Sequence, residues 1–374
     1  MSEQAREAVR HAILDHGPIS FAEFMEIALY GPGGFYEHPP VGERGDFVTS
    51  PHVHPVFAAL MADALAQVWE LLGKPDPFHL VELGAGDGTL ARQLRPELWK
   101  ATGQIRIEYT AVERSPGARE RLRQVGRLRI LPAIEAAPTE ITGCVFANEL
   151  LDNLPFHWLR DTARGAMEVG VDRAPSGDGF TFAERRWPIH DMDPSDADGP
   201  ALVAREERAV PIAGYRLVER IARMLSSGYA LFVDYAGPVA RGDLVHGYRA
   251  HRVLDAEELL IDPGSSDITA AVDLAALVAR AQAVGLQTFT PVSQRAALVA
   301  LGFEEWDRVE RQRQASHQDT RSGRDAVATW SGRNAAALLV DPRGLGGLKW
   351  LVLATSGLPP PTWLTRAIEL DAAG

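Results

Sequence analysis

The chain has 374 residues, of which 46% are hydrophobic and 24% charged, so it can bury a large core and wholesale disorder is excluded. Its single cysteine, Cys144, excludes a disulfide framework and any zinc or iron–sulfur site built on several thiolates, and we expect it to pack inside a strand. The formal charge of −12, from 50 acidic and 38 basic residues, disfavours nucleic acid and anionic membranes as partners.

Residues 1–76 predict a helical lead-in that has no core of its own. Apolar residues recur at helical spacing over 5–14, 21–29 and 54–72, and a turn-rich run, Tyr30–Tyr36, lies between them. The first residues carry no apolar targeting segment, and no stretch approaches the roughly 18 apolar residues of a membrane span. We therefore expect a cytoplasmic protein.

Strands and helices then alternate in the rhythm of a parallel sheet. The apolar run Phe78–Leu83 leads through glycines into a helix from Thr89, which we expect Pro96 to end. Further strands are predicted over 105–112, 128–131, 144–147, 229–233, 286–289 and 348–354, with helices over 117–125, 215–225 and 274–283. Seven strands in this alternation predict a doubly wound α/β fold.

The alternation breaks after residue 160. Two short apolar runs, 167–171 and 180–184, flank a turn rich in proline and glycine and predict a hairpin, and an Asp/Pro loop follows over 188–200. We interpret residues 160–213 as an insertion between two halves of the core, 77–159 and 214–374. The polar, arginine-rich stretch 308–333 predicts a solvated helix and loop.

The turn after the first core strand is a candidate ligand site. It reads Glu82-Leu83-Gly84-Ala85-Gly86-Asp87-Gly88-Thr89. Glycines allow a tight turn and close approach of a ligand, and the start of the next helix favours an anion. The dinucleotide fingerprint G-x-G-x-x-G is not matched, because Thr89 stands at its sixth position. The spacing suits a smaller zwitterionic ligand such as S-adenosylmethionine, with its ammonium close to an acid such as Glu82.

Glu113 ends the second strand about 25 residues after the glycine loop, near the offset at which an acidic side chain binds both ribose hydroxyls. The alternative is a solvated strand end beside a plain turn. We expect the next residue, Arg114, to face solvent.

The fourth strand ends in Asn148, Glu149 and, three residues on, Asp152. Carboxyl ends of parallel strands face the ligand crevice, so these side chains are placed where a substrate nucleophile approaches. The alternative is a helix cap with acids in its first turn. His52 and His54 form a pair without an evident third ligand, so we expect no metal.

Several ordered blocks carry a family resemblance. They are Ala28–Pro32 with Gly34–Tyr36, Gly45–Pro51, Glu82–Leu90, Val112–Pro116, Ala147–Pro155, Asp234-Tyr235, and Pro263-Gly264 with Asp267–Ala270. From about Phe24 to Gly302 the chain resembles the MidA family of class I S-adenosylmethionine-dependent methyltransferases. That family includes the mitochondrial complex I assembly factor that methylates an arginine. The chain departs from the family at four positions. Family members commonly have proline where Ala85 stands, arginine where Asp87 stands, alanine where Asn153 stands and glycine where Ala236 stands.

The resemblance implies a Rossmann-like, seven-stranded class I methyltransferase sheet with an N-terminal helical lid and an inserted substrate subdomain. It also implies that the Gly45–Pro51 segment folds over the cofactor. The candidate cofactor-binding residues are Glu82, Gly84, Ala85, Gly86, Glu113, Asn148, Gly45, Thr49 and Ser50. The candidate catalytic residues are Glu149, Asp152 and Asp46. Glu149 and Asp152 would hold a guanidinium and take up its proton, whereas a hydroxyl acceptor would need a base such as Asp46, His52 or His54.

The leading hypothesis is methyl transfer from S-adenosylmethionine to a protein side chain, arginine by family precedent. One alternative is a small-molecule O- or N-methyltransferase with a metabolite pocket built by Asp161–Ala213. A second is a cofactor-binding assembly factor. An NAD-dependent dehydrogenase ranks last, because Thr89 breaks the fingerprint and no pair for hydride transfer is evident. The partner is then a protein or small-molecule acceptor, and we leave a homodimer open.

Overall fold

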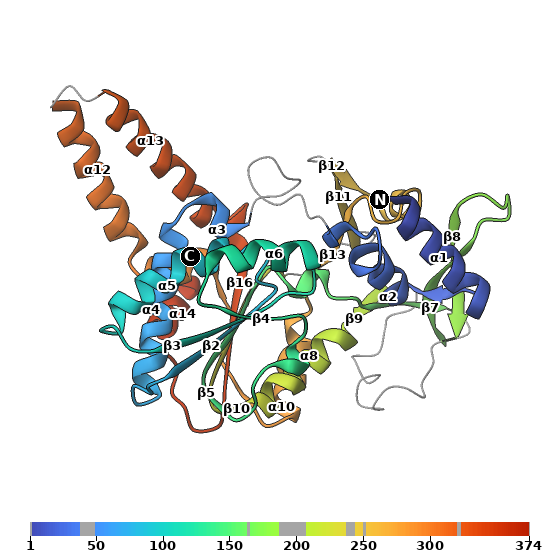
Figure 1. Ribbon diagram of the computed structural model, residues 1–374, viewed down its shortest axis with the longest axis horizontal. Coiled ribbons are helices and arrows are strands. Elements are labelled where there is room, and N and C mark those ends of the chain that lie inside the picture. The colour runs from blue at the N-terminus through green and yellow to red at the C-terminus, as the bar shows by residue number, and fades with distance from the viewer. Residues whose placement is uncertain are drawn as a thin grey trace.

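Strands from distant parts of the chain form one twisted sheet in the computed structural model (Figure 1), which describes residues 2–37, 49–162, 165–186, 207–236, 244–249, 252–319 and 323–373. In spatial order they are β4 (Arg129–Leu131), β3 (Ile107–Val112), β2 (Phe78–Leu83), β5 (Ile141–Asn148), β10 (Leu225–Asp234), β16 (Lys349–Ala354) and β14 (Gln287–Thr288). The first five are parallel, and β16 is antiparallel to β10, to β14 and to the two-residue β15 (Val292–Ser293). The seven predicted strands and the doubly wound fold are confirmed.

Side-chain alternation along the strands explains why both faces of this sheet are buried. On β10, Leu231 and Val233 enter one hydrophobic cluster, and Ala230 and Phe232 enter another. The first cluster is covered by α4 (Val56–Leu71), α5 (Thr89–Ala101), α11 (Gln294–Ala300) and α14 (Thr362–Ala373), and the second by α8 (Ile212–Met224) and α10 (Leu274–Ala283). With both faces covered, a ligand has access at the carboxyl ends of the strands.

The helix after the glycine loop is longer than predicted. We expected Pro96 to end it, but α5 runs from Thr89 to Ala101 with Pro96 inside. Proline in a helix interior removes one backbone hydrogen bond. Leu94 and Leu98, on either side of Pro96, are fully buried in the first cluster. Packing on the sheet therefore holds the helix across the missing bond.

The N-terminal segment has a core, contrary to the prediction. The helices α1 (Ser2–His16) and α2 (Phe21–Met25) and the π-helix η1 (Glu26–Tyr30) belong to a third hydrophobic cluster. In it Phe21 and Phe24 pack with Phe156 and Trp158, and the rings of Phe21 and Trp158 meet edge-on at 5.3 Å between centroids. The sequence missed this core because its two halves are far apart in the chain.

The insertion and the N-terminal strand β1 together form a second sheet, on the right of Figure 1. Its strands are β1 (Ile19–Ser20), β6 (His157–Thr162), β7 (Gly165–Arg173), β8 (Phe180–Arg186) and β9 (Glu207–Val210). The predicted hairpin is confirmed as the antiparallel pair β7 and β8. The sheet begins at His157, before the predicted boundary at residue 160, and the predicted loop 188–200 lies outside the described residues.

A third, smaller sheet was not predicted. It consists of β11 (Val245–Arg249), β12 (Arg252–Leu254) and β13 (Asp267–Ala270), all antiparallel. Val245, Leu254 and Ile268 bury their side chains in the third cluster. Short helices and turns connect the elements: η2 (Phe35–Glu37), α3 (Ser50–Val53), α6 (Pro116–Val125), η3 (Ile134–Ala136), η4 (Leu151–Asn153), α9 (Ala256–Leu259), η6 (Leu338–Val340) and η7 (Leu345–Gly347).

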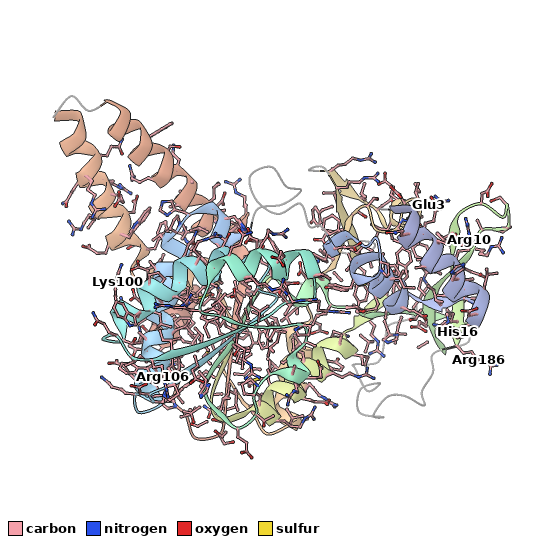
Figure 2. All side chains as sticks on the ribbon, in the orientation of Figure 1. Glu3, Arg10, His16, Lys100, Arg106 and Arg186 are labelled. Carbon is pink, nitrogen blue, oxygen red and sulfur yellow. The ribbon has the colours of Figure 1, made fainter. Side chains whose placement is uncertain are left out.

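The arginine-rich stretch is helical, as predicted. It forms α12 (Phe303–Asp319) and α13 (Gly323–Ala337), a helical hairpin that extends away from the sheet (Figure 1). Charged side chains such as Lys100, Arg106 and Arg186 point outward from the ribbon (Figure 2). Among the described residues, no helix combines the length and apolar character needed to cross a bilayer.

Candidate functional site

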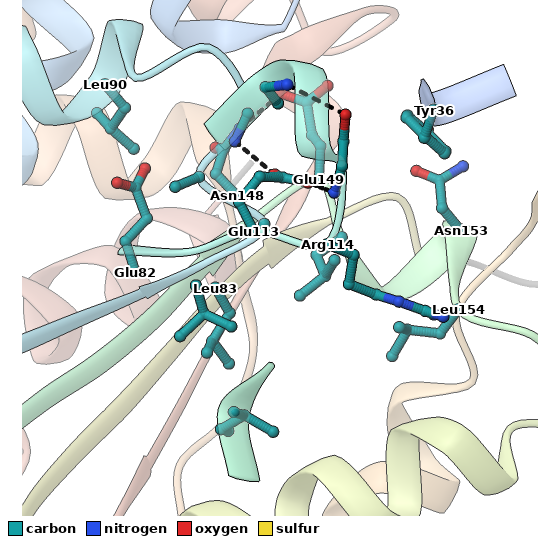
Figure 3. Close-up of a pocket in the computed structure, with 18 of the residues that line it drawn as sticks. Tyr36, Glu82, Leu83, Leu90, Glu113, Arg114, Asn148, Glu149, Asn153 and Leu154 are labelled. Carbon is teal, nitrogen blue, oxygen red and sulfur yellow. Dashed lines mark hydrogen bonds between the residues drawn. The ribbon is translucent and has the colours of Figure 1, made fainter. Parts of the chain in front are cut away.

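A cavity of about 540 Å³ lies at the carboxyl ends of β2, β3 and β5 (Figure 3). Its wall includes the glycine loop, both strand ends that the sequence singled out, and residues from η1, η2, α3 and α8. The predicted cofactor residues in the wall are Thr49, Glu82, Gly84, Ala85, Gly86, Glu113 and Asn148. This volume lies within the range of sites for small ligands.

The glycine loop needs glycine for two different reasons. Gly84, Gly86 and Gly88 have φ values of 67°, 56° and 80°, in the left-handed region that other residues rarely adopt. A Cβ on Gly86 would meet no atom within 4 Å, so its requirement is conformational. A Cβ on Gly88 would lie 2.7 Å from Cγ2 of Val125, so α6 also closes this position sterically.

The Glu113 carboxylate joins the end of β3 to the glycine loop. Its Oε2 accepts the Gly86 N–H at 2.8 Å, and its Oε1 accepts the Ser115 N–H at 2.7 Å. Burial raises its pKa, and these two hydrogen bonds act in the opposite direction. A carboxylate offers about four acceptor positions, so capacity for ribose hydroxyls is left. The sequence predicted the ribose role but not the link to the loop.

Arg114 is more than a solvated residue. Its side chain is 47% exposed, as expected, yet its guanidinium lies 4.2 Å from the centre of the Tyr30 ring and forms an ion pair with Glu26. Arg114 and Tyr30 both line the cavity. The first helices are thereby attached to the end of β3.

Glu82 is buried at the base of the cavity. Its Oε2 accepts the Tyr109 hydroxyl at 2.6 Å. Burial raises the pKa of this carboxyl to about 8, against the effect of the Tyr109 hydrogen bond. The carboxyl is therefore mostly protonated at neutral pH when nothing positive faces it.

The short helix α3 bridges the glycine loop and the end of β5. His52 Nε2 lies 3.3 Å from Asp87 Oδ2, and His52 Nδ1 lies 2.8 Å from Thr49 Oγ1. On its other side, the Ser50 N–H donates to Glu149 Oε1 at 3.0 Å. Burial opposes ionisation of Asp87, but hydrogen bonds from His52 and Thr89 outweigh it, so its pKa lies below the usual range.

The candidate residues between Gly45 and His54 differ in where the structure places them. Ser50 is fully buried and reaches the site through its backbone, while its hydroxyl contacts Gln294. Gly45 and Asp46 lie outside the described residues. His54 packs against the Trp306 ring at 5.0 Å, away from the partners of His52, and the described residues contain no metal-binding group of three His, Cys, Asp or Glu.

Glu149 has an unusual backbone at the end of β5. Its φ is 52°, and its N–H donates to the Val233 carbonyl at 2.7 Å. Its Oε1 also accepts from Asn148 Nδ2 at 2.9 Å, whereas Asn148 Oδ1 is buried without a hydrogen-bond partner among the described residues. Burial raises the Glu149 pKa to about 7. Both side chains line the cavity.

Asp152 lies behind the cavity wall, whereas the sequence predicted it beside the acceptor. It is 7% exposed, it is absent from the wall, and its Oδ1 has no partner among the described residues. Its neighbour Asp234 accepts the N–H groups of Leu150 at 2.9 Å and Leu151 at 2.6 Å. Burial and the charge of Asp234 raise the Asp152 pKa, so this carboxyl holds a proton beside Asp234. Asp234 was not among the predicted site residues.

Comparisons with known proteins identify the family of this chain. A family model described as an S-adenosyl-L-methionine-dependent methyltransferase matches residues 60–292. The chain is 30% identical to protein arginine methyltransferase NDUFAF7, mitochondrial, of Mus musculus, over 81% of this chain and 76% of the relative. It is 32% identical to the NDUFAF7 homolog of Drosophila melanogaster, over 71% and 67%.

A crystal structure from Burkholderia thailandensis with bound S-adenosyl-homocysteine is similar across nearly the whole chain. Its TM-score is 0.82 at 26% identity, and the match covers 98% of this chain and 95% of that one. The chain therefore belongs to the family of S-adenosyl-L-methionine-dependent methyltransferases, and its cofactor is S-adenosylmethionine. This excludes the NAD-dependent dehydrogenase.

Proposed function

We propose that this methyltransferase modifies a protein, and that its acceptor is the guanidinium of an arginine. The proposal rests on one observation above all, the partly buried Glu149 carboxyl that lines the cavity with a pKa of about 7. A group with this pKa can accept a proton at neutral pH. The relatives from Mus musculus and Drosophila melanogaster, named protein arginine methyltransferases, support the choice of acceptor.

The cavity fits the cofactor in size and in the hydrogen-bonding groups of its wall. Gly84 and Gly86 leave room for its amino-acid part, and Glu113 has acceptor capacity for its ribose hydroxyls. Glu82 would face the ammonium, and Thr49, the N-cap residue of α3, would cover the ligand. When bound, the cofactor supplies an electrophilic methyl group on a sulfonium.

Glu149 would orient the acceptor and remove its proton. In the transfer a guanidinium nitrogen gains a bond to the methyl carbon, the bond from that carbon to sulfur breaks, and one proton leaves the nitrogen. The Glu149 carboxylate accepts that proton, while Ser50 and Asn148 hold it in position through Oε1. Asp234 adds negative charge behind it, which favours a cationic acceptor.

The experiment uses purified enzyme, cofactor with a radiolabelled methyl group, and a lysate as the source of acceptors. We expect label in the protein fraction and, after acid hydrolysis, in methylated arginine. Asp234→Asn should keep its affinity for S-adenosyl-homocysteine and lose turnover by at least tenfold, because a neutral amide in place of the Asp234 carboxylate weakens the field at the acceptor. Label in small molecules, or in a protein amino acid other than arginine, would reject the proposal.

Two observations bear on the alternatives. Of the described residues between Asp161 and Ala213, only Ala213 lines the cavity, which gives the metabolite pocket little support. The cofactor-binding assembly factor would keep its cellular role in a variant that cannot bind cofactor. The cytoplasmic location and the homodimer stay predictions, to be tested by cell fractionation and light scattering, since the relatives are named mitochondrial.

A further inference from the structure

Two tyrosines near Glu149 expose their rings. Tyr235 is 43% exposed and Tyr248 is 36% exposed. Tyr235 directly follows β10, and Tyr248 lies in β11, the small sheet that sequence analysis missed. Neither tyrosine is among the residues of the cavity wall, but exposed aromatic side chains close to a site are candidates for ligand contacts, since large rings gain most when they are covered.

Hydrogen bonds from backbone N–H groups, most of them to the Asp234 carboxylate, place Tyr235 next to the turn that carries Glu149. The Glu149 N–H donates to Val233, and Asp234 accepts the N–H groups of Leu150 and Leu151. The Asp234 carboxylate also accepts the Tyr235 N–H at 2.9 Å. The chain at Tyr235 therefore runs alongside the chain at Leu150, at the carboxyl end of the sheet.

A second set of contacts places Tyr248 close to the same turn. Tyr248 is the direct cross-strand partner of Asp267. The Asp267 Oδ1 accepts from Asn153 Nδ2 at 3.0 Å and from the Tyr36 hydroxyl at 2.9 Å. Asn153 ends η4, the turn that follows Glu149, so one carboxylate joins β13 to this turn.

The two phenols and the nearby carboxyls form one electrostatic group. Tyr235 interacts with Glu149, Asp152, Asp234 and Tyr248, and Tyr248 interacts with Asp152 and Asp267. Burial first, and then these carboxylates, raise the pKa of both phenols. Both hydroxyls therefore stay neutral donors at physiological pH.

We call Glu149, Asp152, Asp234 and Asp267 the acidic cluster. Three of its members are less than 9% exposed, and Glu149 is only partly exposed in the cavity wall. Asp152 Oδ1 is more than nine-tenths buried and has no partner in the described part of the chain. A buried oxygen without a partner destabilises the free protein. Asn148 Oδ1 is a second such oxygen among the described residues, and because Asn148 lines the cavity, a donor that enters beside Glu149 can bind it.

We propose that Tyr235 and Tyr248 form the entrance that binds the acceptor arginine and directs its guanidinium to the acidic cluster. The faces of the two rings attract a planar cation, and the apolar parts of the rings cover its methylene stem. This inference rests on the proposed function. It adds the residues that would make the enzyme select arginine.

The test measures binding of two capped pentapeptides to protein saturated with S-adenosyl-homocysteine. One peptide is Gly-Gly-Arg-Gly-Gly, and the other has neutral citrulline in place of arginine. NMR titration follows the wild type, Tyr235→Ala, Tyr248→Ala, the double variant and both Tyr→Phe variants. The matched control is Trp99→Ala, since Trp99 is 45% exposed and lies in α5.

We expect the wild type to prefer the arginine peptide. Each Tyr→Ala change should weaken that peptide about two- to fivefold and the double change about tenfold. The Tyr→Phe variants should retain most of the affinity, Trp99→Ala should match the wild type, and affinity for S-adenosyl-homocysteine should not change. Wild-type preference that survives the double change would overturn this inference alone. Equal binding of both peptides, or of neither, would overturn the proposed function with it.

Discussion

Cofactor binding should release a proton from Glu82. Its carboxyl is buried, holds the Tyr109 hydroxyl at 2.6 Å, and has a pKa of about 8. At pH 7 such a group is roughly 90% protonated. An ammonium placed beside it favours the carboxylate, so its pKa falls when the cofactor binds. We therefore expect most of one proton to be released per site.

Calorimetry in two buffers measures this release. The apparent binding enthalpy at pH 7 should differ between phosphate and Tris by the number of released protons times the difference in buffer ionisation enthalpy. Glu82→Gln keeps an acceptor for Tyr109 but cannot ionise, so it should remove most of the difference. Other carboxyls in the wall, such as Glu149, are unchanged in this comparison. Equal proton release in the wild type and in Glu82→Gln would refute the assignment of the ammonium to Glu82.

The same variant tests the sign of the pH dependence of stability. The folded pKa of Glu82 lies above its ordinary value, so the folded state holds the proton more tightly than the unfolded state. The contribution of this proton to the free energy of unfolding is full at acidic pH and is lost as pH rises through about 8. Each tenfold difference in proton affinity between the folded and unfolded states corresponds to about 1.4 kcal/mol. Urea denaturation without cofactor should show Glu82→Gln gaining stability relative to the wild type between pH 6 and pH 9. A constant difference would contradict the raised pKa.

Four further substitutions test the rest of the wall. Glu113→Ala should weaken the binding of S-adenosyl-homocysteine by about 10- to 150-fold, the equivalent of about 1.5–3 kcal/mol for hydrogen bonds to a charged group. An unchanged dissociation constant in calorimetry would rule out the ribose contact. The wild-type kcat/KM should rise about tenfold per pH unit below pH 7 and level off above it, because Glu149 must be deprotonated to act as the base. Glu149→Gln should remove that slope and lower kcat by about 10²–10⁴-fold, and a retained slope would assign the base elsewhere. His52→Ala should weaken the binding of S-adenosyl-homocysteine about fivefold, because it releases α3 from Asp87, and Asp87→Asn should give a similar loss. Tight binding in both variants would show that the contact between His52 and Asp87 does not support the cofactor site.

The sequence by itself determined the local features of this protein. The short apolar run Phe78–Leu83 predicts a strand, and the structure has β2 over the same residues. The glycine loop was predictable because Gly84, Gly86 and Gly88 each adopt positive φ, which depends on the residue itself and its immediate neighbours. Glu113 could be placed because the strand before it fixes where its side chain emerges.

Only the tertiary structure decided what these features contact. Asp234 binds the N–H of Leu150 across 84 residues, and His52 meets Asp87 across 35. Neither contact leaves a periodic or compositional mark in the sequence, because each depends on how separate segments pack together. The raised pKa values of Glu82 and Glu149 have the same origin, since burial by distant helices and strands, and not the residue type, sets the cost of ionising them.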